Sequence, residues 1–114
     1  MNEENITIEF KYPWTMLPLE NADEWITAVK NSLRPNEPLY RKEIFVSGRH
    51  EYEQLMLVEN DTDGNYAIVS VEYGKANTSI TCKTVVIFDS RKALAEKLRN
   101  DNIDELARFK ENQG

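Results

Sequence analysis

The fold is decided by residues 52–73, which read YEQLMLVENDTDGNYAIVSVEY. Two apolar runs flank Asp61-Thr62-Asp63-Gly64, where Asp favours local hydrogen bonds and Gly accepts a positive φ. This arrangement predicts a β-hairpin with strands at 52–59 and 66–73. A four-residue loop then sets the register of the side chains. The expected pairs are Asn60 with Asn65, Val58 with Ala67, Met56 with Val69, Gln54 with Val71 and Tyr52 with Tyr73.

Further strands are expected on both sides of this hairpin. Residues 44–46 predict a preceding strand that ends near Ser47-Gly48, and residues 80–88 predict the last strand after a looser connection at 74–79. The alternation of apolar and polar residues over 6–12 predicts a first strand that ends at Pro13. The apolar residues 14–19 then form a loop. We expect an antiparallel meander of four to five strands.

Two helical regions flank the sheet. Asn21, with Glu24 three residues later, has the spacing of a capping box and predicts a helix that ends before Pro35. Its apolar stripe contains Ala22, Trp25, Ile26, Val29 and Leu33.

The end of the chain is also predicted to be helical. Asp89 or Ser90 is a suitable cap for a first helix, and Asn102 with Glu105 predicts a second one after a break near residues 100–101. Residues 111–114 are expected to fray. The whole chain, residues 1–114, is therefore predicted to be one α+β domain with an N-terminal helix and C-terminal helices packed on the sheet.

The chain is acidic. Its 20 acidic and 14 basic residues give a formal charge of −6 and a pI near 4.8. This charge disfavours direct binding to nucleic acid or to an anionic membrane, and it favours a basic partner. The acidic start of the chain and the absence of any run near 20 apolar residues indicate a cytoplasmic protein.

The acidic residues are concentrated in one segment. No Lys or Arg occurs between Arg49 and Lys75, although the same stretch holds six acids. A patch of negative charge alone, with tyrosines beside it, favours a partner-binding surface. The alternative is that these acids cluster by chance on a solvated hairpin. The candidate partner-binding residues are Glu51, Tyr52, Glu53, Glu59, Asp61, Asp63, Tyr66 and Glu72.

The predicted register also leaves a second apolar sheet face. Leu55 and Leu57 fall there beside Ile68, with Val85 and Ile87 of the last strand on the same face. Acidic residues lie at its edges. Either a helix covers this face or part of it binds a partner.

Few residues suited to catalysis or metal binding are present. His50 is the sole histidine and is expected to be a solvated side chain on a polar turn; Cys82 is the sole cysteine and lies in an apolar alternating run. One His and one Cys do not make a structural zinc site. Ser70 stands six residues after Gly64, where a calcium loop containing Asp61, Asp63 and Gly64 would need a glutamate. We expect no enzymatic activity, no cofactor and no metal.

In its overall type, the chain resembles the immunity proteins of bacterial contact-dependent growth inhibition and related polymorphic-toxin systems. The resemblance rests on the acidic hairpin 51–72, the helix containing Trp25 and the meander that ends in residues 84–89 before terminal helices. It implies a cytoplasmic protein that binds a cognate, basic toxin domain, often a nuclease, and neutralises it.

Three other functions are compatible with the sequence. A phage-type inhibitor would imitate nucleic-acid charge, but the basic residues at 91, 92, 97, 99, 108 and 110 nearly balance the C-terminal helices. A structural homodimer would bury the spare sheet face against a second copy, so the protein is expected to be a monomer or a homodimer. A small enzyme would need a cleft containing His50.

Overall fold

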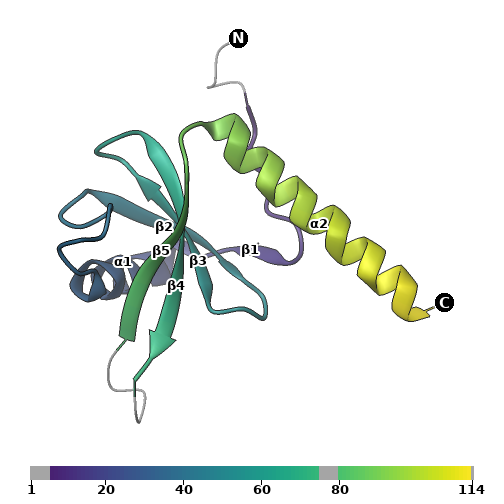
Figure 1. Cartoon of the computed structure of the whole chain (residues 1–114), viewed down its shortest axis with the longest axis horizontal. Coiled ribbons are helices and arrows are strands. Elements are labelled where there is room, and N and C mark those ends of the chain that lie inside the picture. The colour runs from purple at the N-terminus through teal and green to yellow at the C-terminus, as the bar shows by residue number, and fades with distance from the viewer. Residues whose placement is uncertain (1–5, 75–79, 114) are drawn as a thin grey trace.

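The computed structural model describes residues 6–74 and 80–113, and it has the α+β architecture expected from the sequence (Figure 1). Five antiparallel strands follow one another in chain order across a single sheet. Helix α1 (Leu19–Ser32) precedes most of the sheet in sequence, and helix α2 (Arg91–Gln113) follows it. The strands are β1 (Trp14–Met16), β2 (Ile44–His50), β3 (Leu55–Asn60), β4 (Asn65–Tyr73) and β5 (Ile80–Phe88).

The central hairpin has the predicted register. Asn60 pairs with Asn65, Val58 with Ala67 and Met56 with Val69. Gly64 has a φ of 73°, the left-handed conformation for which the turn needs glycine. The paired ladder ends at Leu55 and Ser70, so residues 52–54 belong to a bend rather than to β3. Of the expected connection at 74–79, residues 75–79 lie outside the described part of the chain.

The first strand was predicted at the wrong place. Residues 6–12 have no strand structure, and the edge of β2 is instead paired by β1, which the sequence had indicated as a loop. The alternation in 6–12 has another cause, because Ile8 and Phe10 are partly buried against a cluster that includes residues of α2. Alternation of apolar and polar residues shows that one side of an extended segment is buried. It does not require that the segment pairs with a neighbouring strand.

Strand β5 has the predicted bounds but contains an unpredicted irregularity. Val69 pairs with Thr84, whereas the preceding residue Ile68 pairs with Val86, which leaves Val85 as an extra residue. After this bulge, the side chains of β5 point to the opposite sheet face from the one that an uninterrupted alternation would give them. Val86 and Phe88 therefore lie on the face of Ile68, and the prediction that they share the face of Cys82 was wrong.

Helix α1 covers one face of the sheet. Val29 and Leu33 pack with Val46, Val58 and Val69 in the larger of the two cores, which also contains Cys82. The helix begins at Leu19 after Pro18 and has no side-chain cap, so the predicted capping box at Asn21 does not form. Pro18 is suited to this position because it lacks the N–H that a helix start leaves unpaired.

Helix α2 covers part of the opposite face. Leu94 and Leu98 pack on Trp14, Leu57 and Ile68 in the second core. The backbone N–H of Ala93 donates to Ser90 Oγ, which confirms Ser90 as a cap. The helix is continuous from Arg91 to Gln113, so the predicted break near residue 100 was wrong. The expected frayed tail 111–114 falls partly on this helix, and residue 114 lies outside the described part of the chain.

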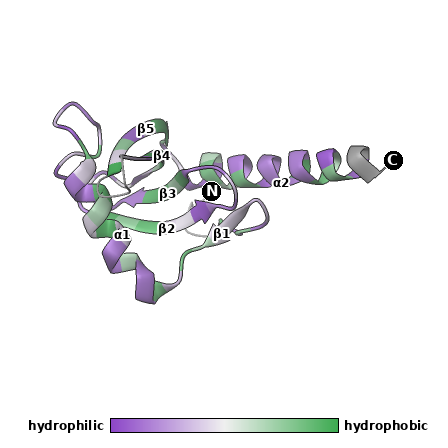
Figure 2. Cartoon of the chain, turned by 90° about the horizontal axis from the view of Figure 1, so that it is seen from below, coloured by the Kyte–Doolittle hydropathy of each residue, from purple (hydrophilic) through white to green (hydrophobic). Residues whose placement is uncertain are grey.

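The C-terminal half of α2 projects beyond the sheet (Figures 1 and 2). Three apolar side chains on this half are exposed: Ile103 at 54%, Leu106 at 54% and Phe109 at 61%. The segment 6–12 runs beside the first half of the helix, and Asn102 Nδ2 donates to the carbonyl of Tyr12 where that segment ends. Among the described helices, none is long and apolar enough to span a membrane.

Candidate protein-binding site

The structure divides the eight predicted site residues between the two ends of the central hairpin. Glu59, Asp61, Asp63 and Tyr66 lie at the turn end, and the other four lie at or beyond the opposite end. Tyr66 and Glu72, one from each group, lie six residues apart on β4, which corresponds to roughly 20 Å. The predicted residues therefore do not form one continuous patch. The other four are Glu51, Tyr52, Glu53 and Glu72.

One acid at the turn end, Asp63, is engaged in the fold itself. Asp63 lies 3.2 Å from Lys42 Nζ, and it accepts a hydrogen bond of 3.0 Å from Asn60 Nδ2. The amide of Asn60 and the Lys42 ammonium both lower the pKa of Asp63. Lys42 lies outside the base-free segment between Arg49 and Lys75 in the sequence. In the folded chain it nevertheless lies next to Asp63. Asp63 therefore stabilises the shape of the turn.

Glu59 and Tyr66 are only partly accessible. Glu59 is half-buried, and its pKa is raised first by burial and then by the nearby Asp61 carboxylate. Tyr66 packs against the second core. Asp61 is exposed, and its carboxylate makes no ion pair or hydrogen bond with another described residue. The turn end thus offers one exposed acid without a local partner.

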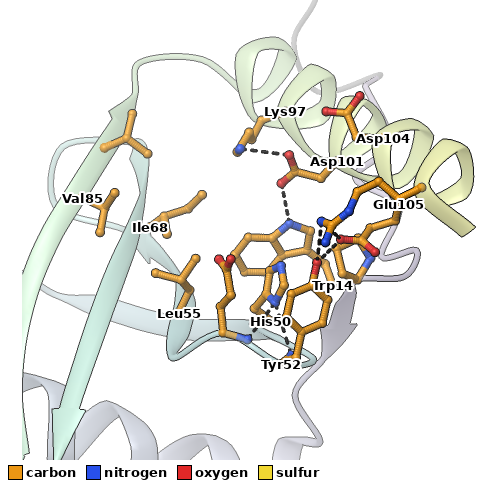
Figure 3. A pocket seen from close by; sticks show the side chains of 14 residues that line it. Trp14, His50, Tyr52, Leu55, Ile68, Val85, Lys97, Asp101, Asp104 and Glu105 are labelled. Atoms are coloured by element: carbon orange, nitrogen blue, oxygen red, sulfur yellow. Dashed lines mark hydrogen bonds and ion pairs between the residues drawn. The ribbon is translucent and has the colours of Figure 1, made fainter. Parts of the chain in front are cut away.

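A groove lies at the other end, between α2 and the sheet (Figure 3). Its volume is about 290 Å³. Leu55 of β3, Ile68 of β4 and Val85 of β5 form an apolar floor, and Val85 is 58% exposed. Helix α2 supplies the polar wall. Here a helix covers only part of the second sheet face, which leaves an apolar strip open beside it.

Trp14 ties the wall of the groove to the sheet. Its side chain is buried, and its indole Nε1 donates a 2.8 Å hydrogen bond to Asp101 of α2. The same carboxylate accepts from Lys97 at 2.9 Å, one helical turn earlier. Asp101 is therefore fully engaged, and this contact fixes the position of α2 relative to β1.

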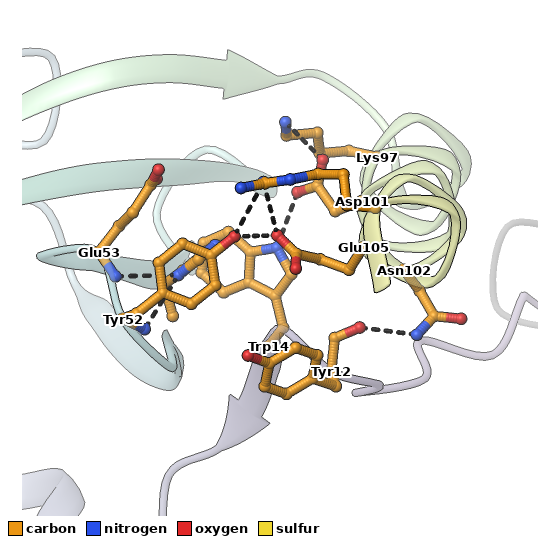
Figure 4. Close-up of polar contacts among 10 residues, drawn as sticks. Tyr12, Trp14, Tyr52, Glu53, Lys97, Asp101, Asn102 and Glu105 are labelled. Atoms are coloured by element: carbon orange, nitrogen blue, oxygen red, sulfur yellow. Dashed lines mark hydrogen bonds and ion pairs between the residues drawn. The ribbon is translucent and has the colours of Figure 1, made fainter. Parts of the chain in front are cut away.

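A second network closes one end of the groove (Figure 4). The hydroxyl of Tyr52 donates to Glu105, and Arg108 Nη1 donates to both, at 3.3 Å to the hydroxyl and 3.1 Å to the carboxylate. Tyr52 was singled out from the sequence, but its partners on α2 were not. No local pattern indicates them, because they lie more than 50 residues away in the chain.

His50 is part of the support of this site and is not a solvated turn residue. It is 7% exposed, and its Nδ1 accepts backbone hydrogen bonds from Tyr52 (3.3 Å) and Glu53 (3.0 Å). Nδ1 is therefore the unprotonated ring nitrogen. Its ring meets Trp14 edge-on at 5.1 Å and Tyr52 at 4.5 Å. The prediction of a solvated side chain was wrong because β2 continues to His50 and places it against the core.

A second hollow adjoins the groove on the far side of the Tyr52 network. It has a volume of about 400 Å³ and is lined by Tyr12, Leu106 and Phe109, together with Glu105 and Arg108. The last two residues also line the groove. The two hollows thus share one wall and extend along the projecting half of α2, where aromatic and aliphatic side chains are exposed.

Two carboxylates of the groove have no local partner. Lys97 is paired with Asp101, and Arg108 with Glu105. Glu53 and Asp104 also line the groove and are exposed, yet neither carboxylate makes an ion pair or hydrogen bond with any other part of the chain that the structure describes. Glu53 lies on the bend between β2 and β3, and Asp104 lies on α2. The groove therefore carries a net negative charge.

The remaining reactive groups are buried or dispersed. Burial raises the pKa of the Cys82 thiol to about 11, so the thiolate is disfavoured at neutral pH. Within residues 6–74 and 80–113, no three His, Cys, Asp or Glu side chains are grouped closely enough to hold a metal ion. The described surface offers an apolar, acidic groove rather than a set of groups arranged around a nucleophile.

Comparison with known proteins gives no relative: no family model, no curated protein and no solved structure matches this chain.

Proposed function

We propose that this protein acts by binding another protein, and that it is an immunity protein which neutralises a basic toxin domain in the cytoplasm. The observation that carries the proposal is the groove between α2 and the sheet. An apolar floor beside unpaired carboxylates is typical of an interface with a buried centre and a charged rim. The formal charge of −6 would steer a basic partner toward it.

The Tyr52 network supports a rigid binding surface. Tyr52 is held by Glu105 and Arg108, and the bend that carries it is held by His50. A side chain that is already positioned loses little conformational freedom when a partner binds. Tyr12 and Phe109, both exposed on the adjoining hollow, provide the aromatic contact area on which interfaces commonly depend.

The arrangement of charges favours this function over imitation of nucleic acid. A phosphate mimic needs a long row of regularly spaced acids, whereas these acids fall into two groups and several are paired with bases. A homodimer is a second candidate, because Ile103 and Phe109 lie three residues on either side of Leu106. In an antiparallel pair of α2 helices, Ile103 of one copy would face Phe109 of the other.

Co-expression tests the proposal. The immunity function predicts a gene for a large secreted protein immediately upstream, and the C-terminal domain of that protein is then the candidate toxin. Cells that produce this domain should stop growing, and co-production of the chain should restore growth and yield a stable complex on purification. Continued growth arrest and no complex would exclude the immunity function. Sedimentation velocity tests the second candidate, which predicts a dimer that Phe109→Ser converts to a monomer.

A further inference from the structure

The floor of the groove is suited to the aliphatic part of a long side chain. Leu55, Ile68 and Val85 come from three neighbouring strands and present a continuous apolar strip next to α2 (Figure 3). The volume of about 290 Å³ exceeds that of any single side chain. It leaves room for one extended side chain and part of the backbone that carries it.

The charge at the rim defines the end of that side chain. The groove is lined by four acids and two bases, and both bases are already paired within α2. The two unpaired carboxylates come from different elements, Glu53 from the bend between β2 and β3 and Asp104 from α2. A cation placed in the groove would be attracted by both carboxylates, whereas an anion would be repelled by them.

We infer that the groove between α2 and the sheet is the docking site for an arginine or lysine side chain of a protein partner. The aliphatic stem lies on Leu55 and Val85, and the charged group reaches Glu53 and Asp104. Basic side chains bind in this way because their stems are apolar while their ends stay hydrated. The inference rests on the proposed function, since it names the chemistry by which the partner is recognised.

The adjoining hollow adds a second requirement on the partner. Because Tyr12, Leu106 and Phe109 line it and Glu105 and Arg108 separate it from the groove, an apolar side chain there would lie beside the docked cation. The partner segment that fits both hollows therefore combines a basic residue with a neighbouring apolar one.

A short peptide tests this inference without the partner. The probe is the capped pentapeptide Gly-Leu-Arg-Leu-Gly, titrated into the ¹⁵N-labelled full chain while backbone amide shifts are followed. Its counterpart contains citrulline, which has the shape of arginine and no charge. We expect saturable shifts at residues 53–55, 85–86 and 104 with the arginine peptide. The citrulline peptide should bind about threefold to tenfold more weakly, the range for losing two exposed ion pairs.

Two double variants with the same change in net charge complete the design. E53Q/D104N should weaken the arginine peptide to the level of the citrulline peptide. D23N/E24Q changes two exposed acids of α1, on the other face of the sheet, and should leave binding unchanged. All four side chains are exposed, and none of the four takes part in a salt bridge or side-chain hydrogen bond with the rest of the described chain, so both variants should fold normally.

Four outcomes would overturn the inference. The first is equal affinity for both peptides, and the second is an unchanged affinity of E53Q/D104N for the arginine peptide. The third is that the largest amide shift changes occur at the turn 59–66. The fourth is that, without peptide, the amide shifts of the groove residues change with protein concentration. The last would identify a second copy of the chain as the occupant. If the peptide fails to bind but co-expression rescues growth, the proposed function stands and uses another surface. If the peptide binds but co-expression does not rescue growth, the groove is a docking site for a basic side chain on a protein of another function.

Discussion

Trp14 and Asp101 are 87 residues apart in sequence, and the indole N–H of Trp14 donates a 2.8 Å hydrogen bond to the Asp101 carboxylate. This bond joins the first strand to the middle of the last helix. It lies at the base of the groove, so the geometry of the proposed binding site depends on it. The contact is partly buried, and its loss would leave a buried indole N–H without a partner.

Replacing Asp101 with alanine should destabilise the protein by about 1–3 kcal/mol, because the buried Trp14 N–H loses its acceptor. Urea unfolding followed by tryptophan fluorescence measures this change. The matched control is Asp104→Ala, three residues along the same helix, where the exposed carboxylate has no local partner. That control should change the free energy of unfolding by less than about 0.5 kcal/mol. Equal effects of the two variants would contradict the assigned role of Asp101.

Gly48 should not accept a larger residue. A Cβ at this position would lie 2.4 Å from Phe10 Cε1 and 3.0 Å from the carbonyl oxygen of Thr15. Gly48→Ala should therefore destabilise the fold by about 1–3 kcal/mol, since Phe10 must leave its place over β2. In the background of Phe10→Ala the same change should cost clearly less, because the main clash is gone. Strict additivity in this double-mutant cycle would show that Phe10 does not pack there.

Cys82 should react slowly with thiol reagents in the folded protein. Its side chain is buried, and burial raises its pKa from 9.0 to about 11. Between pH 9 and 11 the unfolded chain releases the thiol proton while the folded chain retains it, so the free energy of unfolding should fall with rising pH. Cys82→Ala should flatten that part of the curve. Rapid native-state labelling with Ellman's reagent at pH 8 would contradict the burial.

Glu59 should be destabilising as a carboxylate. Burial and the neighbouring Asp61 raise its pKa above 4.5, so the folded chain takes up this proton at a higher pH than the unfolded chain does. As the pH falls through the raised pKa toward 4.5, this residue should contribute increasing stability. Glu59→Gln should make the protein more stable at pH 7. It should also remove the gain in stability that Glu59 gives as the pH falls, as measured by thermal unfolding at several pH values. A lower stability of this variant at pH 7 would contradict the cause assigned.

Local patterns predict much of the sheet, because its central hairpin is specified by neighbouring residues. Asp61 to Gly64 defines the turn, and the turn defines which side chains of β3 and β4 lie opposite each other. The bulge at Val85 has no such local signal. It changes the face on which Val86 and Phe88 lie, and so determines which residues face the groove.

Long-range contacts explain why α2 was predicted as two pieces. Asn100, Asp101 and Asn102 have low helix propensity, which favours a break. In the structure Asp101 binds Trp14 and Lys97, and Asn102 binds the Tyr12 carbonyl, so tertiary contacts stabilise the helix at this point. The same kind of contact places Glu105 and Arg108 beside Tyr52.

The candidate site was only half indicated by the sequence. The stretch without bases drew attention to Tyr52 and Glu53, which line the groove. It also included the turn acids, because a linear charge count does not include Lys42, which pairs with Asp63. The helical half of the groove, with Asp104 on its wall, becomes visible only when the chain is folded.

The central claim is that the groove, and not the hairpin turn, binds a basic toxin domain. The most direct test is the dissociation constant of the complex with the cognate toxin domain, measured for two double charge reversals. E53K/D104K in the groove should weaken binding at least about tenfold, whereas D23K/D61K, which reverses the exposed acid of the turn and one on α1, should change it less than about threefold. The opposite order, or no measurable complex with the unaltered chain, would contradict the account.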